Sequence, residues 1–118
     1  MRKLEDLEIY SMSMNFGEKV WSAVSQWDFF NKSTIGIQWV RSSDSIAANL
    51  AEGYGRNSNK EVLQYCYYSR GSLKETVCFL QKSYSRSLVT QEFYNEALVD
   101  LEVLGKKLNS YINYLRSH

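Results

Sequence analysis

Residues 46–75 constrain the fold of this chain more than any other segment. They read IAANLAEGYGRNSNKEVLQYCYYSRGSLKE and place Gly53 and Gly55 between two segments with apolar residues at helical spacing. Because glycine adopts positive φ at little steric cost, the pair predicts the end of one helix. Ser58 and Glu61 have the spacing of a capping box, which satisfies backbone N–H groups at a helix start. The segment therefore predicts a sharp corner between two long helices.

Apolar residues at helical spacing predict four helices. We expect them from about Leu4 to Trp27, from Ile35 to Glu52, from Ser58 to Ser85, and from about Thr90 onward. The chain has no proline, the strongest helix breaker. Residues 29–34 are predicted to form a loop, with Ser33 or Thr34 as the next N-cap. Short connections between long helices favour antiparallel neighbours, so the sequence predicts an all-α, up-down-up-down four-helix bundle in a single domain, residues 1–118.

Each predicted helix has an expected inward face. The first three faces are Leu7, Tyr10, Met14, Trp21 and Val24; Trp39, Ser43, Ile46 and Leu50; and Val62, Cys66, Ser69, Leu73, Val77 and Leu80. The fourth is nearly a heptad seam of Phe93, Ala97, Leu101, Leu104, Leu108, Tyr111 and Leu115. Further apolar residues lie off the first face, at Ile9, Phe16, Val20 and Trp27. This excess predicts that copies of the chain pack side by side; the alternative is that a small bundle tolerates surface aromatics.

Charge and hydropathy narrow the function classes. Fourteen basic and thirteen acidic residues give a net charge of +1, which argues against a generic polyanion-binding domain. The N-terminal MRKLEDLEIY turns acidic before an apolar run develops, and no segment approaches the roughly 20 apolar residues of a membrane span. A cytoplasmic protein without membrane contact is therefore expected. Cys66 and Cys78 would lie about 18 Å apart on one helix, too far for a disulfide.

The central motif resembles that of a known family. It consists of Arg41, then Ser45-Ile46-x-x-Asn49-Leu50-Ala51-Glu52-Gly53-x-Gly55-Arg56-x-Ser58-x-x-Glu61, then Gly71-Ser72-x-x-Glu75. It is similar to the signature of the bacterial four-helix bundle family named for the 23S ribosomal RNA intervening-sequence protein, and Leu7-Glu8-Ile9-Tyr10 resembles that family's opening. The resemblance covers nearly the whole chain. The proline often found between the first two helices is missing here.

The resemblance implies a closed bundle that assembles into a homopentameric ring. It also implies RNA or ribonucleoprotein as a partner, because the founding genes lie in insertions within 23S ribosomal RNA genes. A related branch, the accessory variability determinants of diversity-generating retroelements, binds nucleic acid and a reverse transcriptase through a strongly basic surface. With its net charge of +1, this chain does not share that basic surface. The resemblance implies no enzymatic activity.

We expect the motif to stabilise the corner or a subunit contact. Its members are Arg41, Asn49, Glu52, Gly53, Gly55, Arg56, Ser58, Glu61, Gly71, Ser72 and Glu75. Asn49 is expected to hydrogen-bond the backbone of the turn at residues 53–57. Glu52 and Arg56, on either side of the corner, are candidates to pair with Arg41, Glu61 or Glu75. Gly71 and Ser72 lower helix propensity, so we expect another helix to cross closely there with an aromatic ring in the notch.

Six basic residues are candidates for nucleic-acid binding: Arg56, Lys60, Arg70, Lys74, Lys82 and Arg86. Arg56 and Lys60 flank a predicted helix start, where free N–H groups attract phosphate. The other four form two pairs at i, i+4 spacing, near Tyr67 and Tyr68, and bases stack on such rings while cations follow the backbone. A solvated helix face is the alternative interpretation.

No catalytic site, metal site, cofactor or small-molecule substrate is expected. The only histidine is the terminal His118, which leaves no Ser–His or Cys–His pair and almost no histidine metal site. Glu92, Glu96 and Asp100 form an acidic ladder that suits a hard cation, although a solvated face is favoured. Three hypotheses follow: an oligomeric adaptor for RNA or a ribonucleoprotein, a protein-interaction scaffold without nucleic-acid binding, and a metal-dependent enzyme. The adaptor is preferred.

Overall fold

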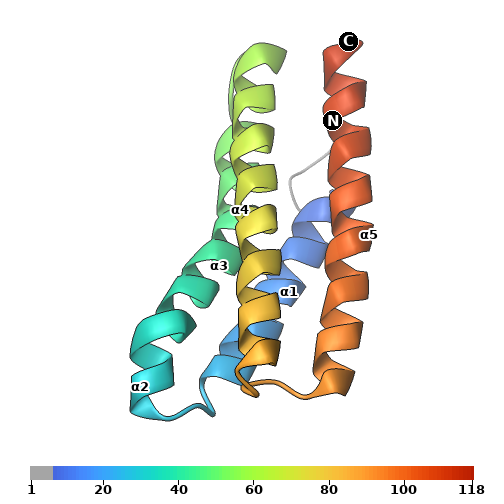
Figure 1. Ribbon diagram of the computed structural model, residues 1–118. Coiled ribbons are helices and arrows are strands. Elements are labelled where there is room, and N and C mark those ends of the chain that lie inside the picture. The colour runs from blue at the N-terminus through green and yellow to red at the C-terminus, as the bar shows by residue number, and fades with distance from the viewer. Residues whose placement is uncertain (1–6) are drawn as a thin grey trace.

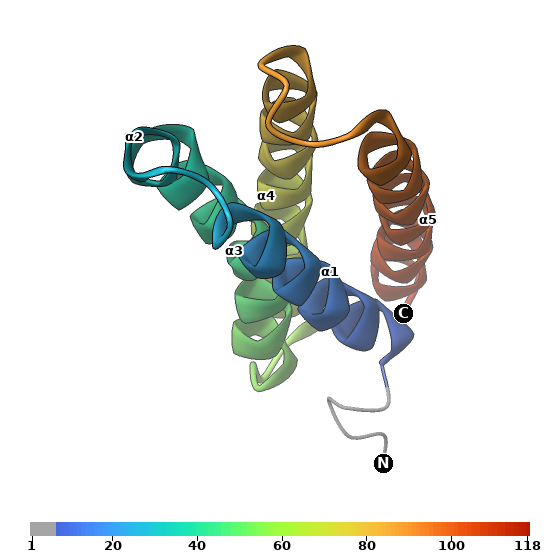
Figure 2. The same ribbon diagram turned by 90° about the horizontal axis from the view of Figure 1, so that it is seen from below.

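The computed structural model describes residues 7–118 and contains only helices within that range (Figure 1). They are α1 (Glu8–Val24), the short α2 (Phe29–Asn31), a π-helical segment (Lys32–Gly36), α3 (Ile37–Tyr54), α4 (Asn59–Ser85) and α5 (Gln91–Arg116). The long helices α1, α3, α4 and α5 pack in an arrangement consistent with a four-helix bundle. Seen from below, α3 packs against both α1 and α4, and α5 packs against α4 and against α1 (Figure 2). The predicted first residue of α1, Leu4, lies outside the described residues.

Side-chain caps start the last two long helices where the sequence predicted them. The Ser58 hydroxyl accepts a hydrogen bond from the Glu61 backbone N–H at 3.3 Å, and α4 begins at the next residue. The Thr90 hydroxyl accepts from the Phe93 N–H at 3.0 Å, and α5 begins at Gln91. Each cap satisfies an N–H group that lacks an intrahelical partner. The predicted end of the third helix, Ser85, is also confirmed.

The predicted loop at residues 29–34 is wrong, because the chain is already helical there. Asp28 is the N-cap, and its carboxylate accepts from the Asn31 N–H at 2.9 Å. Ser33 and Thr34 do not cap; their hydroxyls donate to the carbonyls of Phe29 and Phe30, at 2.7 and 2.8 Å. Aspartate is as good an N-cap as serine, and with no proline downstream the helix continues through the π-helical segment into α3.

The inward face predicted for α1 is wrong in its middle. Met14 and Trp21 are 47% and 60% exposed, whereas Phe16 and Val20, predicted to lie off the face, are buried. Small residues lie on the inward face of α1. A Cβ on the buried Gly17 would come within 2.7 Å of Asp44 Oδ1 on α3, so the Asp44 side chain would have to move to admit it.

The other inward faces are largely as predicted. Trp39, Ser43, Ile46 and Leu50 of α3 are all buried. The α4 and α5 faces are each rotated slightly from the prediction: Val62, Val77, Phe93 and Tyr111 are half-buried, whereas Thr76, Ser83 and Ile112 are buried. Buried hydroxyls join α3 to α4, because Ser69 donates to the Ile46 carbonyl at 2.8 Å and Thr76 to Ser42 Oγ at 3.1 Å. None of the helices described is long and apolar enough to cross a membrane.

Candidate nucleic-acid interface

The corner between α3 and α4 depends on a close contact at Gly53. Gly53 lies within the last turn of α3 and is buried; a Cβ there would approach Tyr65 Cβ of α4 to 2.7 Å. Gly55 follows the helix with φ −85°, and no glycine among residues 7–118 has positive φ. The predicted use of positive φ is therefore wrong. The corner needs Gly53 because two helices meet there, not because the backbone turns left-handed.

Charged side chains form contacts on the outer side of this corner. Arg56 forms an ion pair with Glu52, and its Nη2 also donates to the Tyr65 hydroxyl at 2.8 Å. The guanidinium carbon lies 4.8 Å from the centroid of the Tyr65 ring, within the range of a cation–π contact. Glu52 and Arg56 thus pair with each other rather than with the predicted partners. Neither Arg41 nor Glu75 has an ion-pair partner among residues 7–118.

Asn49 does not reach the turn at residues 53–57. Its Nδ2 donates to the Ser45 carbonyl one turn earlier in α3, at 2.9 Å. The prediction is wrong because an asparagine within a helix meets the carbonyl four residues back before it meets groups beyond the helix end. This contact satisfies one donor and leaves the amide oxygen available.

The six candidate basic residues fall into two groups. Arg56 and Arg70 are held by internal contacts: Arg70 Nη1 donates to Asn109 Oδ1 of α5 at 3.1 Å and its guanidinium lies over the Tyr67 ring. The other four are exposed and have no ion pair or side-chain hydrogen bond within the described part of the chain; they are Lys60, Lys74, Lys82 and Arg86.

The row of cations on α4 winds around the helix. Four residues advance a helix about 40° beyond a full turn, so Arg86 is rotated by about 160° from Arg70. Arg70 consequently faces α5, whereas Lys74 and Lys82 occupy the outer face of α4. Lys74, Lys82 and Arg86 are therefore the members of the row without a side-chain partner among residues 7–118.

Gly71 and Ser72 form an open notch instead of a helix crossing. A Cβ on Gly71 would have no neighbour within 4 Å, and Gly71 is exposed, so no helix of residues 7–118 makes the predicted crossing. Four residues of the motif line this shallow depression, and they come from both α3 and α4: Asn49, Gly71, Ser72 and Glu75. Tyr67 and Tyr68 complete its wall. The motif thus brings residues from separate parts of the chain to one exposed place.

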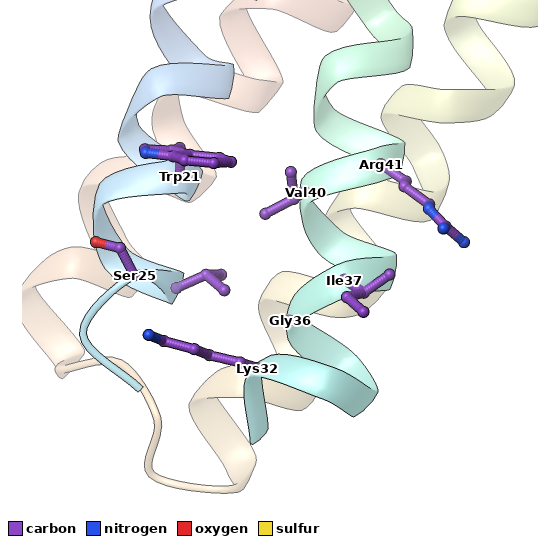
Figure 3. Close-up of a pocket in the computed structure, with 8 residues that line it drawn as sticks. Trp21, Ser25, Lys32, Gly36, Ile37, Val40 and Arg41 are labelled. Atoms are coloured by element: carbon purple, nitrogen blue, oxygen red, sulfur yellow. The ribbon is translucent and has the colours of Figure 1, made fainter. Parts of the chain in front are cut away.

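A second depression, the Trp21 groove, lies between α1 and α3 and was not predicted. Its apolar wall is Trp21, Val24, Ile37 and Val40, and its volume is about 410 Å³. Trp21 and Val40 face each other across the groove from the two helices, with Lys32 at its lower edge and Arg41 on its outer side (Figure 3). The excess apolar residues of α1 were the signal in the sequence, but Trp21 had been assigned to the core.

Two groups have shifted pKa values. Burial, and to a lesser degree the nearby Glu18 carboxylate, raises the pKa of Asp44, which lies against Gly17. Burial raises the pKa of the Cys66 thiol to about 11, whereas Cys78 is exposed; both cysteines are free. Among residues 7–118 no group of three or more His, Cys, Asp and Glu side chains is placed to hold a metal ion. In the acidic ladder, Asp100 pairs with Lys19 at 2.9 Å.

A comparison with models of protein families assigns the chain to a family. The model of the 23S rRNA-intervening sequence protein family matches residues 5–110. The chain belongs to this family. The match contains the corner, the notch and the whole basic row, so the motif that carried the resemblance lies within the matched region.

Solved structures agree with the 23S rRNA-intervening sequence protein fold. A crystal structure at 1.70 Å of a protein of unknown function from the S23 ribosomal protein family of Bacteroides thetaiotaomicron has a TM-score of 0.79. It is 21% identical, and the alignment covers 88% of this chain and 97% of that one. At this identity the likeness establishes the fold alone. A comparison with curated proteins finds no match.

Proposed function

We propose that this chain is a non-catalytic, homo-oligomeric helical bundle that acts in the cytoplasm as an adaptor for RNA or a ribonucleoprotein. Membership of the 23S rRNA-intervening sequence protein family is the observation that carries this proposal. The family name refers to 23S ribosomal RNA, which makes a structured RNA the first partner to test. The lone terminal histidine supports a role without catalysis.

The proposed assembly is a homopentameric ring of antiparallel, up-down-up-down bundles. Large apolar side chains that remain exposed on the single chain support assembly, since such patches mark interaction sites. Trp21 and Val99 are 60% and 58% exposed. A ring repeats every basic residue once per subunit, so a chain with a net charge of +1 still presents several equivalent rows of lysine to one RNA.

The proposed RNA contact is the outer face of α4, where Lys74 and Lys82 are exposed and unpaired among the described residues. The test is a binding titration of nucleic-acid-free protein with a structured RNA over a series of salt concentrations. Phosphate contacts make log K fall linearly with log[salt], in proportion to the charges neutralised. We expect the Lys74→Glu/Lys82→Glu variant to bind more weakly and to lower the slope by about one for each phosphate that the lysines no longer neutralise.

Arg116→Glu is the matched control, because it reverses an exposed charge at the far end of α5. Its affinity and salt slope should equal those of the unmodified protein. Unchanged binding by the Lys74→Glu/Lys82→Glu variant would exclude the outer face of α4 as the contact. Absence of binding at low salt would exclude the adaptor role.

A protein-interaction scaffold without nucleic-acid binding is the second candidate. It is favoured by the near-zero net charge and by exposed aromatic residues, including Phe29 and Phe30 at 83% and 71%. Aromatic side chains are enriched in the centres of protein interfaces. Recovery of a specific protein partner from nuclease-treated lysate, combined with no RNA binding in the titration, would support the scaffold over the adaptor.

A further inference from the structure

We infer that copies of this chain assemble by docking the outer seam of α5 of one copy into the Trp21 groove of the next. The outer seam consists of Glu92, Glu96, Val99 and Val103. This inference rests on the homo-oligomer of the proposed function and adds the two surfaces that make it. The occupant of the groove is a second copy of the chain.

The outer seam has the spacing of a packing helix, although it faces away from the core of its own chain. Its residues are separated by four, three and four positions, the a/d spacing that keeps side chains on one line along a helix. Val99 and Val103 are 58% and 38% exposed, and Glu92 and Glu96 are exposed with no ion pair within residues 7–118. The seam is thus an unpartnered stripe, apolar in one half and acidic in the other.

The Trp21 groove complements the seam in both shape and charge. Its apolar wall lies between two helices, as a groove that receives a third helix does. Its two charged lining residues, Lys32 and Arg41, are both cations without an ion pair in the described part of the chain, and no acidic residue lines it. The acidic half of the seam therefore meets Lys32 at the lower edge of the groove while its valines meet the apolar wall (Figure 3).

The two surfaces lie at the same height along the bundle. Lys19, half a turn before Trp21 on α1, bonds Asp100 of α5, and the Phe93 ring of α5 lies edge-on to Trp39 of α3, with centroids 6.2 Å apart. Side-by-side copies consequently need no shift along the bundle axis. An interface made from two different surfaces does not stop at a dimer, and it forms a ring when the rotation from one copy to the next closes.

Sedimentation velocity on two blocking variants tests this arrangement. Trp21→Glu places a charge in the apolar wall of the groove and leaves the seam intact; Val99→Glu places a charge in the apolar half of the seam and leaves the groove intact. Both positions are more than half exposed on the single chain, so the variants should keep its fold, which circular dichroism verifies. We expect each variant alone to sediment as the 13.8 kDa chain.

An equimolar mixture gives the sharper result. One intact groove and one intact seam remain between the two variants, so the mixture should form a heterodimer of twice the chain mass and nothing larger. Tyr68→Glu is the control, because this exposed aromatic on α4 belongs to neither surface; it should assemble like the unmodified protein.

The possible failures are distinct. If the unmodified protein is an oligomer and both blocking variants keep its size, or the mixture gives no heterodimer, the seam and groove are not the interface, while the proposed oligomer stands. If the unmodified protein is a monomer at every concentration, the proposed oligomer fails and this inference fails with it. The RNA titration is independent of either result.

Discussion

The chain enters α3 through the connection at residues 25–36 and leaves it through the corner at residues 55–58, and different contacts hold these two places. The corner is held mainly by residues close in sequence, the Ser58–Glu61 cap and the Glu52–Arg56 pair. The connection is held by distant ones, since the Trp27 ring stacks on Trp39 at 5.8 Å and its indole N–H donates to the Leu88 carbonyl at 3.0 Å. Local contacts can be read from a sequence, whereas contacts over such separations require the fold.

Trp27→Ala should have the largest effect, because it removes the ring that anchors the connection. We expect the free energy of unfolding to fall by about 3 kcal/mol, the lower end for truncating a large aromatic that is half-buried here. Denaturant titration measures this value. Phe29→Ala, two residues on and 83% exposed, is the control and should stay within about 0.5 kcal/mol. Equal losses in both variants would mean that the connection is not held by Trp27.

Gly53→Ala tests whether the corner also depends on close packing. The added Cβ would lie 2.7 Å from Tyr65 Cβ, so we expect a loss of about 1–3 kcal/mol as α3 and α4 are forced apart. Gly55→Ala should instead be neutral or stabilise by up to about 1 kcal/mol, because φ is −85° and the space is open. Comparable destabilisation by the two changes would show that backbone conformation, rather than helix contact, selects glycine at the corner.

Ser58→Ala measures how much the helix cap at the corner contributes to stability. Loss of the cap leaves the Glu61 N–H without its acceptor and should cost about 1 kcal/mol in the free energy of unfolding. Ser58→Thr keeps a hydroxyl acceptor and should recover most of that stability. If alanine and threonine behave alike in thermal and denaturant unfolding, the cap contributes nothing and the contrast between corner and connection is lost.

Asp44→Asn should have the smallest effect on stability. Asp44 lies where α1 and α3, the two helices joined by the connection, pack against each other. The pKa of Asp44 is raised in the folded protein by burial and by Glu18, so its ionised form destabilises the fold above that pKa. The variant should therefore melt slightly higher than the unmodified protein at pH 7. The difference should shrink as the pH falls through the raised pKa, where Asp44 itself becomes protonated.

Asp100→Asn should instead lower the melting temperature at pH 7, because it removes the ion pair with Lys19. Melting temperatures of both variants across pH 3–7 provide the comparison. A gain for Asp44→Asn that stays constant down to the lowest pH would contradict a charge effect at this residue.

The sequence predicted the elements held by contacts between neighbouring residues better than those held by contacts between distant residues. Ser58 was identified as a helix start because its capping partner Glu61 lies three residues away, and the start near Thr90 followed from the apolar spacing after it. Asp28 was missed because the apolar Phe29 and Phe30 after it stay exposed, contrary to what their residue type suggests. The face of α1 was misjudged because large apolar residues surround it, and its contacts with α3, such as Gly17 against Asp44, join residues far apart in the chain.

The candidate site was only partly predictable. The exposure of Lys74 and Lys82 agrees with a charged row on an amphipathic helix. The engagement of Arg70 by Asn109 was not foreseeable, because it depends on how α5 lies against α4. The Gly71 notch and the Trp21 groove likewise join residues from two helices, and no spacing within one helix indicates them.

The two cysteines differ in a way that provides a practical tool. Cys66 is buried and its raised thiol pKa keeps it protonated, whereas Cys78 is exposed on α4, four residues from Lys74 and four from Lys82. A maleimide dye should therefore modify Cys78 selectively in the native protein, without any engineered cysteine. One fluorophore per subunit would then lie within the lysine row. Its fluorescence would report any RNA that binds that face, and stepwise photobleaching of single particles would count the subunits of the proposed ring.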